Sequence, residues 1–423
     1  MNFLRRFARQ YLPNSTRTSL VKLYDAVLVW KWKFRWWKKR CFKPIPAPKK
    51  SGVLLVGYLH GGFGIGSILR LSALALKEAE IPFKVFDFNP RPHTTLNDDE
   101  LKQYLTQVPE YSINIFCIGA YQLPILRKIF GKNFFQDRHN ILYGAWELSR
   151  LPEQWIRYLE CIDEIWAMSS FVGHMFRRST SLPVYDFPLP VQSPQIGSWN
   201  RNQFQIPKND FVFLFMFDFD SHVARKNPEA VIKAFKYAFP KSNQIPVSLV
   251  IKSINGNRNL NNQRTIDDII DGDSRIIQMH KTLSHDENTA LMHCCDCYVS
   301  LHRSEGFGLT IAEAMLTGKP VIITGYSGNL DFTTAQNSLL VDYQLVPVQM
   351  NYIFQYSKGE MWADPDIEQA GDHMRKLVRD TNFACSFAKR GQELIRTSFS
   401  IEAVGKRYKN RLTKIFQQKT IDQ

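Results

Sequence analysis

The sequence predicts an α/β protein with two doubly wound, Rossmann-like domains in tandem, preceded by a basic aromatic segment. Short apolar runs alternate with amphipathic segments along most of the chain, which is typical of βαβ units and of parallel sheets covered on both faces. The length of 423 residues suits two domains. With 44% hydrophobic and 22% charged residues, the composition is close to the globular average, which excludes a wholly disordered, collagen-like or coiled-coil chain.

We expect the first domain over residues 51–190, where the first apolar run follows directly on Ser51 and Gly52. The expected strands are 53–58, 83–88, 113–118, 140–143 and 164–168, and the expected helices are 69–76, 101–108, 123–130 and 153–161. Five prolines between residues 183 and 210 then indicate a linker, which we place at 191–210.

The strand–helix alternation begins again in a second domain, expected over residues 211–365, and residues 366–423 are expected to form helices. The expected strands are 211–217, 247–251, 275–279, 297–301 and 320–323, and the expected helices are 228–239, 262–271, 286–293 and 310–317. Doubly wound sheets bind ligands beyond the carboxyl ends of their strands. Two such domains facing each other would therefore form a ligand cleft.

The net charge of +15 is concentrated at one end of the chain. Residues 1–50 hold 14 Lys and Arg against one acid, Asp25, whereas the other 373 residues carry only +2. This distribution argues against a nucleic-acid-binding fold, because the body is nearly neutral.

The basic aromatic segment, residues 1–50, interleaves tryptophans with Lys and Arg between Trp30 and Arg40. That composition is typical of a segment bound at an anionic membrane surface. A solvated basic arm and helices packed on the body remain alternatives. We expect neither a transmembrane helix, since no run of about 18 apolar residues occurs, nor a secretory signal. The odd number of cysteines, seven, favours a reducing, cytoplasmic location, peripheral to the membrane if the segment binds lipid.

The most informative segment is 304–315, SEGFGLTIAEAM. Glu305 follows an expected strand, and glycines free the backbone just before an expected helix, whose N-terminal amides suit a diphosphate. Glu305 and Glu313 are eight residues apart, about 12 Å along a helix. That is too far for the carboxylate pair of a retaining glycosidase, which needs about 5–5.5 Å. The spacing suits one carboxylate on a sugar and one on a ribose, with a pyrophosphate between them.

This segment resembles the E-x7-E motif of retaining glycosyltransferases with the GT-B fold, and its surroundings resemble glycosyltransferase family 4. The likeness covers about residues 51–400 and is strongest from 211 to 345. Outside the motif it is carried by residues 225–228, 234–235, 165–172 and 326–329.

The resemblance implies retaining transfer of a sugar, a hexose, from a nucleoside-diphosphate sugar to a glycan or lipid-linked glycan. No metal or other cofactor and no covalent enzyme intermediate would be needed. Glu305 would hold donor-sugar hydroxyls, Glu313 would bind the ribose, and Lys226 with Arg225 would neutralise the leaving diphosphate. The backbone amides that would line the sugar and diphosphate belong to Gly306, Phe307, Gly308 and Leu309.

The first domain offers fewer candidates, all on the acceptor side. Gly62 and Gly64 lie in a turn between an expected strand and helix, where they would contact a ligand or simply form a tight turn. Their spacing is not a clean G-x-G-x-x-G, so NAD binding is disfavoured. The family often has a histidine after a strand of this domain, near the sugar; the matching strand here is followed by Glu147, which would face the cleft instead.

Three alternatives remain open. Asp218 and Asp220 form a D-x-D that could hold Mg²⁺ or Mn²⁺ on a diphosphate, or could be ordinary turn acids. Cys294, Cys295 and Cys297 with a neighbouring histidine could suggest zinc, although buried thiols fit their spacing better. Finally, the chain could be a catalytically inactive GT-B body that binds a membrane or nucleic acid through its basic aromatic segment. The intact E-x7-E motif counts against that alternative.

Overall fold

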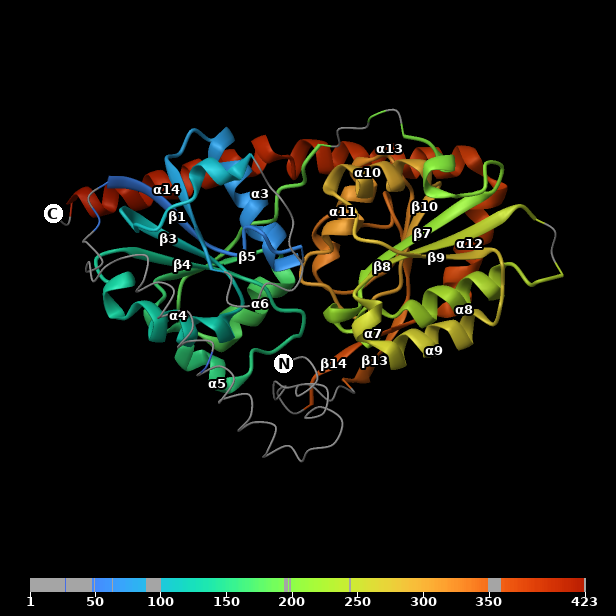
Figure 1. The fold of residues 1–423 in the computed structure, drawn as a ribbon, viewed down its shortest axis with the longest axis horizontal. Coiled ribbons are helices and arrows are strands. Elements are labelled where there is room, and N and C mark those ends of the chain that lie inside the picture. Colours follow the sequence, from blue (N-terminus) through green and yellow to red (C-terminus); the bar gives the residue numbers. More distant parts are fainter. Residues whose placement is uncertain are drawn as a thin grey trace.

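The computed structural model describes Val27, Pro48 and residues 50–62, 64–88, 100–193, 197, 199–242, 245–348 and 359–421. The expectations for the basic aromatic segment therefore lie outside the described residues, apart from three positions. Two six-stranded parallel sheets lie side by side, each flanked by helices (Figure 1). The predicted fold class, two doubly wound α/β domains, is confirmed.

The first sheet has the strand order β2-β1-β3-β4-β5-β6, and every neighbouring pair is parallel. Its strands are mostly apolar and largely buried, because helices cover both faces of the sheet. The strands are β1 (Lys50–Gly57), β2 (Phe83–Asp87), β3 (Tyr111–Cys117), β4 (His139–Gly144), β5 (Glu164–Ala167) and β6 (Val184–Asp186). The helices are α3 (Gly64–Glu78), α4 (Leu123–Phe130), α5 (Glu153–Ile156) and α6 (Ser170–Ser179).

Two local features of this domain differ from the expected elements: one expected helix is wrong, and one strand was not expected. The expected helix 101–108 is a single 3-10 turn, Leu101–Tyr104, because Leu105 turns extended and bridges to Val85 of the edge strand β2. A strand that we did not expect, β6, lies at the start of the proline-rich stretch 183–210 and within the expected first domain, before the linker that we place at 191–210. Its three residues pair with β5 at the sheet edge, where flanking prolines are tolerated.

The second sheet has the order β12-β11-β10-β7-β8-β9, again parallel throughout. The strands are β7 (Phe211–Asp218), β8 (Val247–Ile254), β9 (Ile276–His280), β10 (Cys297–Ser300), β11 (Val321–Thr324) and β12 (Leu339–Val341). The helices are α7 (Val223–Lys226), α8 (Pro228–Ala238), α9 (Leu260–Ile270), α10 (His285–Cys294), α11 (Leu309–Leu316) and α12 (Ile367–Arg379). An antiparallel hairpin that we did not expect, β13 (Tyr343–Pro347) and β14 (Met361–Pro365), extends from this domain.

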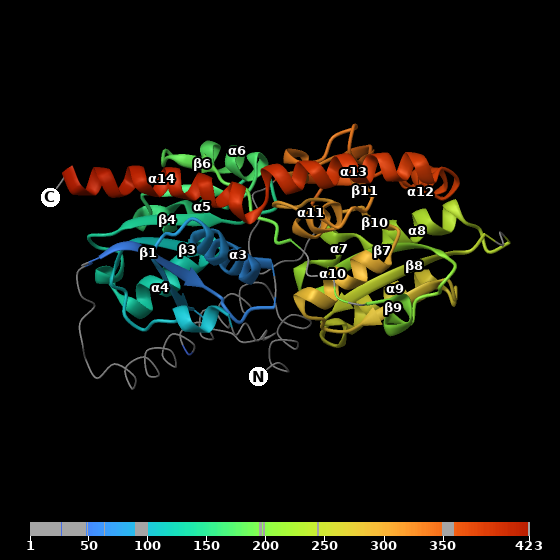
Figure 2. The same cartoon turned by 90° about the horizontal axis from the view of Figure 1, so that it is seen from above.

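The C-terminal helices α13 (Thr381–Ser398) and α14 (Ile401–Ile421) join the two domains. They follow one another along the length of the molecule, so that α14 returns to the first domain and packs on α3 (Figures 1 and 2). Tyr408 of α14 is fully buried there, against Trp166 and Phe187. Where α13 meets α14, the Phe399 carbonyl accepts a hydrogen bond from the Val191 amide at 2.7 Å, so both connections between the domains lie side by side.

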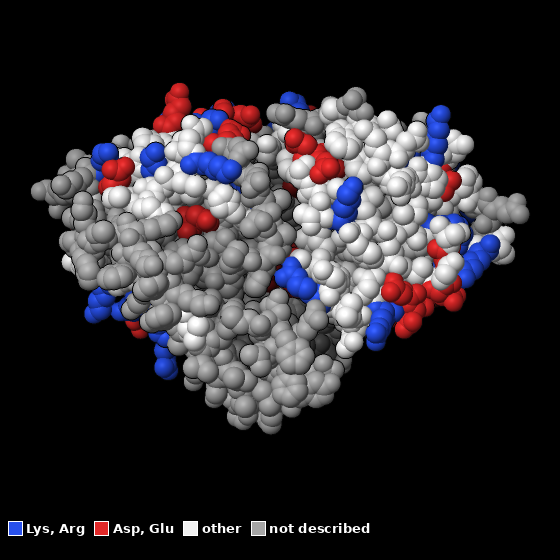
Figure 3. Space-filling view, viewed as in Figure 1, with Lys and Arg blue, Asp and Glu red and all other residues white. Residues whose placement is uncertain are grey.

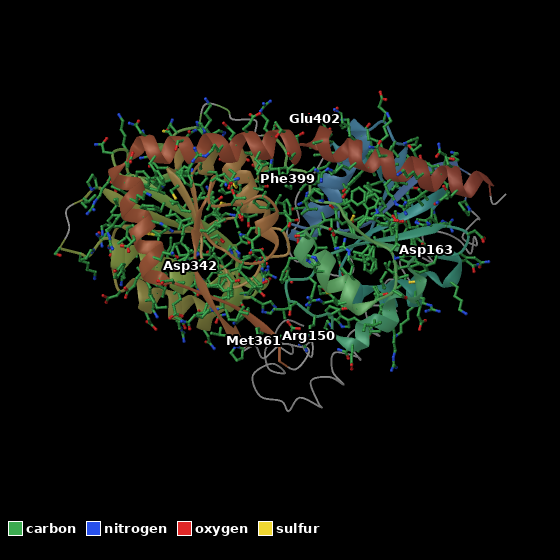
Figure 4. The ribbon with its side chains drawn as sticks, turned by 180° about the vertical axis from the view of Figure 1, so that it is seen from behind. Arg150, Asp163, Asp342, Met361, Phe399 and Glu402 are labelled. Atoms are coloured by element: carbon green, nitrogen blue, oxygen red, sulfur yellow. The ribbon has the colours of Figure 1, made fainter. Side chains whose placement is uncertain are left out.

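Opposite this junction the domains touch again. The Ser149 amide and hydroxyl donate to Glu360, the residue before β14, at 3.2 and 3.1 Å. Figure 4 shows the neighbouring Arg150 and Met361 together at this contact, on the other side of the molecule from Phe399 and Glu402. No helix in the described part of the chain is long and apolar enough to cross a membrane.

Candidate active site

Strand order alone marks where a ligand should bind in the second domain. From β7 the chain adds β8 and β9 on one side, then crosses to add β10 on the other, so the order reverses between β7 and β10. Doubly wound sheets bind ligands at the carboxyl ends of the strands at such a point. Two of the predicted site residues follow these two strands: Lys226 comes after β7 and Glu305 after β10.

Glu305 is the centre of a buried charge cluster. Its Oε1 accepts from the Lys226 Nζ at 2.5 Å and lies 3.3 Å from an Arg225 guanidinium nitrogen. Burial opposes ionisation of Glu305, but the charges of Lys226 and Arg225 outweigh it and lower the pKa of this carboxyl to about 2. The site therefore holds a permanent carboxylate whose second oxygen, Oε2, can accept hydroxyl groups.

Arg225 links this cluster to the first domain. Its guanidinium donates to the carbonyl oxygens of Ser304 at 2.8 Å and Ser221 at 3.1 Å, and it lies 3.6 Å from a carboxylate oxygen of Glu147, beyond β4. The Ser304 hydroxyl also donates to the Glu147 carbonyl. The structure thus brings Arg225, Lys226, Glu305 and Glu147 together, although Glu147 comes from the opposite domain.

Close backbone packing shapes the loop from Glu305 to α11. Gly308 has φ +92°, a left-handed conformation that favours glycine, and directly precedes the first residue of α11. At Gly306 a Cβ would lie 3.3 Å from the Met168 sulfur of the first domain. The Phe307 ring is buried against Phe332, so only its backbone can face a ligand.

A methyl group at Gly328 should disrupt this loop. A Cβ there would lie 2.1 Å from the Gly306 carbonyl oxygen, a backbone atom that cannot yield without moving the loop. We expect Gly328→Ala to cost about 1–3 kcal/mol of stability and to lower turnover, measured by thermal unfolding and by initial rates. Gly197→Ala is the control, since its Cβ would meet only Trp199 at 3.4 Å. Wild-type stability and turnover of Gly328→Ala would contradict this account of the loop.

Glu313 is a second carboxylate of different character. It lies in α11, partly buried, and no hydrogen bond or ion pair joins its carboxylate to any residue that the structure describes. Burial raises the pKa of Glu313 to about 7. An acid that is desolvated without a partner is available for a ligand with hydroxyl groups.

Comparison with known proteins assigns the family. Residues 199–394 match the family described as Glycosyl transferases group 1. This match spans the second domain and most of α13. The protein is identified as a retaining glycosyltransferase that uses a nucleotide-sugar donor, as the resemblance implied. No curated protein sequence matches the chain.

Solved structures share the fold of this glycosyltransferase. HepE from Anabaena in complex with UDP and glucose gives a TM-score of 0.62 at 15% identity, covering 86% of this chain and 100% of that chain. Sucrose-phosphate synthase from Thermosynechococcus elongatus gives 0.65 at 15% identity, covering 87% and 100%. A glycosyltransferase from Rickettsia africae ESF-5 gives 0.62 at 12% identity, covering 87% and 99%. At these identities the likeness shows the GT-B fold.

Sequence reasoning did not single out the residues that orient Glu305. The Glu305 amide donates to the hydroxyl of Ser327, at 2.8 Å. His302 is fully buried, and its Nε2 lies between the Tyr326 carbonyl at 3.2 Å and the Asn329 amide oxygen at 3.0 Å, so Nε2 carries the proton. Burial lowers the pKa of His302. In the sequence, only the family resemblance at residues 326–329 pointed to this part of the site.

The acceptor-side glycines belong to a turn of the first domain. Gly62 and Gly64 follow β1, at the point between β1 and β3 where the first sheet reverses its strand order. The turn is held by Arg70, which donates to the carbonyl oxygens of Leu59 at 3.0 Å and Gly61 at 2.7 Å. A Cβ at Gly64 would meet no atom within 4 Å, so steric crowding does not require glycine there.

The candidate metal ligands are engaged in local contacts. Asp218 accepts from Asn255 at 2.7 Å and from the Asp220 amide at 2.9 Å, where it caps a 3-10 turn. Asp220 pairs with Arg258 at 3.3 Å. Within the described ranges, no group of three or more His, Cys, Asp or Glu could hold a metal ion. Cys295 and Cys297 are buried free thiols.

Proposed function

We propose that the protein transfers a hexose from UDP-hexose to a hydroxyl of a glycan or lipid-linked glycan. The observation that carries the proposal is the Glu305 carboxylate, which lies with Lys226 and Arg225 at the β7–β10 reversal of strand order. The choice of UDP is supported by similar solved structures: HepE in complex with UDP and glucose, and the pneumococcal O-GlcNAc transferase GtfA in complex with UDP and GlcNAc.

Each carboxylate has a separate role in donor binding. Glu305 accepts hydroxyl groups of the sugar, and the backbone amides from Gly306 to Leu309 line the sugar and diphosphate. Glu313 accepts the two ribose hydroxyls. When the donor is bound, the Lys226 ammonium group contacts the diphosphate instead of Glu305. It stabilises the negative charge that grows on the diphosphate as the leaving group departs.

The transfer step needs no covalent enzyme intermediate. The bond between the anomeric carbon and the diphosphate oxygen breaks, and the acceptor oxygen forms its bond to that carbon from the same face. The acceptor proton passes to the leaving diphosphate. Because Arg225 already contacts two carbonyls and two carboxylates, it acts as a positioning residue that holds Glu305 against the Glu147 loop. Gly62, Gly64 and Glu147 form the acceptor side.

The test is an assay with UDP-glucose, UDP-GlcNAc, GDP-mannose and ADP-glucose, each with a mixed panel of free and lipid-linked glycans. We expect release of UDP and a product whose anomeric configuration, read by NMR, equals that of the donor. Inverted product, or neither hydrolysis nor binding with any donor, would contradict the proposal.

We further propose that the basic aromatic segment holds the enzyme at an anionic, cytoplasmic membrane face. Each Lys or Arg near such a surface contributes about 1 kcal/mol. Deleting residues 1–49, which precede β1, should leave a folded enzyme that no longer sediments with phosphatidylglycerol vesicles at low salt. Phosphatidylcholine vesicles and high salt are the controls. Equal sedimentation of both forms would show that the basic aromatic segment is not the membrane anchor.

The alternative, an inactive body that binds nucleic acid, has less support. On the one face that Figure 3 shows, the described Lys and Arg side chains are scattered among Asp and Glu and form no extended basic patch. Duplex binding relies on clustered positive charge and weakens steeply with salt. Salt-dependent RNA binding by the form lacking residues 1–49 would favour this alternative.

A further inference from the structure

One buried cation of the second domain has no role in the site described above. Lys252 of β8 has only 6% of its surface exposed. No hydrogen bond or ion pair joins its ammonium group to any residue in the described part of the chain. A buried charge without a partner lowers stability, so packing alone does not explain a lysine at this position.

Strand register places Lys252 next to the donor site. Lys252 pairs with Met216 of β7, and Leu214, two residues earlier on β7, pairs with Tyr298 of β10. Two strand spacings, about 10 Å, therefore separate Lys252 from β10. Val250, on the same face by alternation, belongs to the apolar cluster that includes residues of α10 and α11. Lys252 thus lies on the sheet face covered by these two helices.

The same face leads to the start of α11. Tyr298 donates to the Thr310 hydroxyl, in the first turn of α11, at 2.9 Å. Lys252 is also near the carboxyl edge of the sheet, because Ile254, two residues later, pairs with the last residue of β7. A ligand anion at the first turn of α11 would lie at this edge, and a lysine ammonium is a compact charge that binds phosphate.

We propose that Lys252 contacts the diphosphate of the nucleotide-sugar donor, as a second cation beside Lys226. The inference rests on the proposed function. In the free protein Lys226 is neutralised by Glu305 at 2.5 Å, whereas no carboxylate lies within ion-pair distance of Lys252 among the described residues. The charge of Lys252 is therefore available to stabilise the departing diphosphate without first breaking an ion pair.

The surroundings of Lys252 give this contact a pH signature. Two charged groups face it, Asp218 at the end of β7 and Glu287 in α10. Burial lowers the pKa of Lys252 to about 8, against the opposing effect of these two acids. An anion bound to the ammonium raises its pKa again. At about pH 8.5 UDP binding should therefore be accompanied by uptake of a fraction of a proton, whereas the phosphates of UDP are already ionised.

The experiment compares the wild-type enzyme with Lys252→Met and with a surface control, Lys241→Met. Lys241 lies in the same domain in an exposed ion pair with Asp271. Calorimetry with UDP at about pH 8.5, in buffers of different ionisation enthalpy, measures affinity and proton uptake; ligand-observed NMR measures binding of uridine. We expect Lys252→Met to bind UDP about 10- to 150-fold more weakly, to lose the proton uptake, to bind uridine normally and to unfold at a higher temperature. Lys241→Met should match the wild type.

The outcomes separate this inference from the function it rests on. Unchanged UDP affinity in Lys252→Met would overturn it, and so would equal losses of UDP and uridine binding together with a lower unfolding temperature. A wild-type enzyme that binds no nucleoside diphosphate at all would instead contradict the proposed function.

Discussion

Replacing Glu305 by glutamine is expected to lower turnover about 10- to 150-fold, the effect of losing one charged hydrogen bond worth about 1.5–3 kcal/mol. The amide keeps the shape of the side chain but replaces one acceptor oxygen with a donor. Because Glu305 faces the sugar in the proposed complex, UDP affinity should be unchanged or slightly tighter, since Lys226 no longer has a carboxylate partner. Steady-state rates and UDP calorimetry measure the two effects separately.

The same substitution should destabilise the fold. It leaves the buried cations Lys226 and Arg225 without the carboxylate between them, and removing one partner of a buried pair costs about 3–5 kcal/mol. The pKa of Glu305 is lowered to about 2, so its carboxylate stabilises the fold above the unfolded-state pKa and this contribution is lost as pH falls towards 2. The difference in unfolding temperature should therefore shrink on acidification. Glu229→Gln, in an exposed pair with Lys233, is the control. Wild-type turnover of Glu305→Gln would mean that the sugar is held elsewhere.

The long strands of the fold were predictable because their burial is reflected in their own apolar residues. Most residues of β1, β7 and β8 are buried, so these strands contain apolar runs such as 53–56, 211–217 and 249–251. Edge strands such as β6 and β12 are only three residues long, too short for a pattern to identify them, and pairing with a neighbouring strand decides their conformation. The packing position of α14 could not be predicted either, because it depends on contacts between residues far apart in the sequence. Tyr408, for example, shares a hydrogen bond with Ser72, 336 residues earlier.

The residues of the candidate site also fall into two groups, those that a local motif predicts and those whose contacts depend on the tertiary structure. Lys226 and Glu305 are 79 residues apart, and the motif around each was sufficient to nominate them because β7 and β10 are neighbours in a doubly wound sheet. The ion pair between Arg225 and Glu147 depends on how two domains meet, which no local pattern encodes. The isolation of Lys252 is likewise a tertiary property, since an apolar run that contains one lysine does not reveal whether a partner lies opposite.

Glutamine in place of Glu313 should weaken UDP binding and at the same time stabilise the free enzyme. Burial raises the pKa of this carboxyl from 4.5 to about 7, so its ionisation destabilises the folded state increasingly as pH rises above the unfolded value. The destabilisation is on the order of 3 kcal/mol at pH 8 and below 1 kcal/mol at pH 5. The gain in unfolding temperature for Glu313→Gln should therefore be larger at pH 8 than at pH 5.

Ionisation of Glu313, which destabilises the free enzyme, should strengthen its binding of UDP. Two ribose hydroxyls can both donate to an ionised carboxylate, whereas a protonated carboxyl presents one donor of its own. Wild-type affinity for UDP should thus rise from pH 6 to pH 8 as Glu313 ionises, more steeply than that of Glu313→Gln, which retains only the titration of the UDP phosphate and Lys252. Calorimetry of both proteins across this range measures the difference. Parallel pH profiles would show that Glu313 does not bind the ribose. If Glu305→Gln and Glu313→Gln lost turnover and UDP affinity in the same proportion, the separate roles proposed for the two carboxylates would be wrong, because only a carboxylate on the nucleoside should control UDP binding.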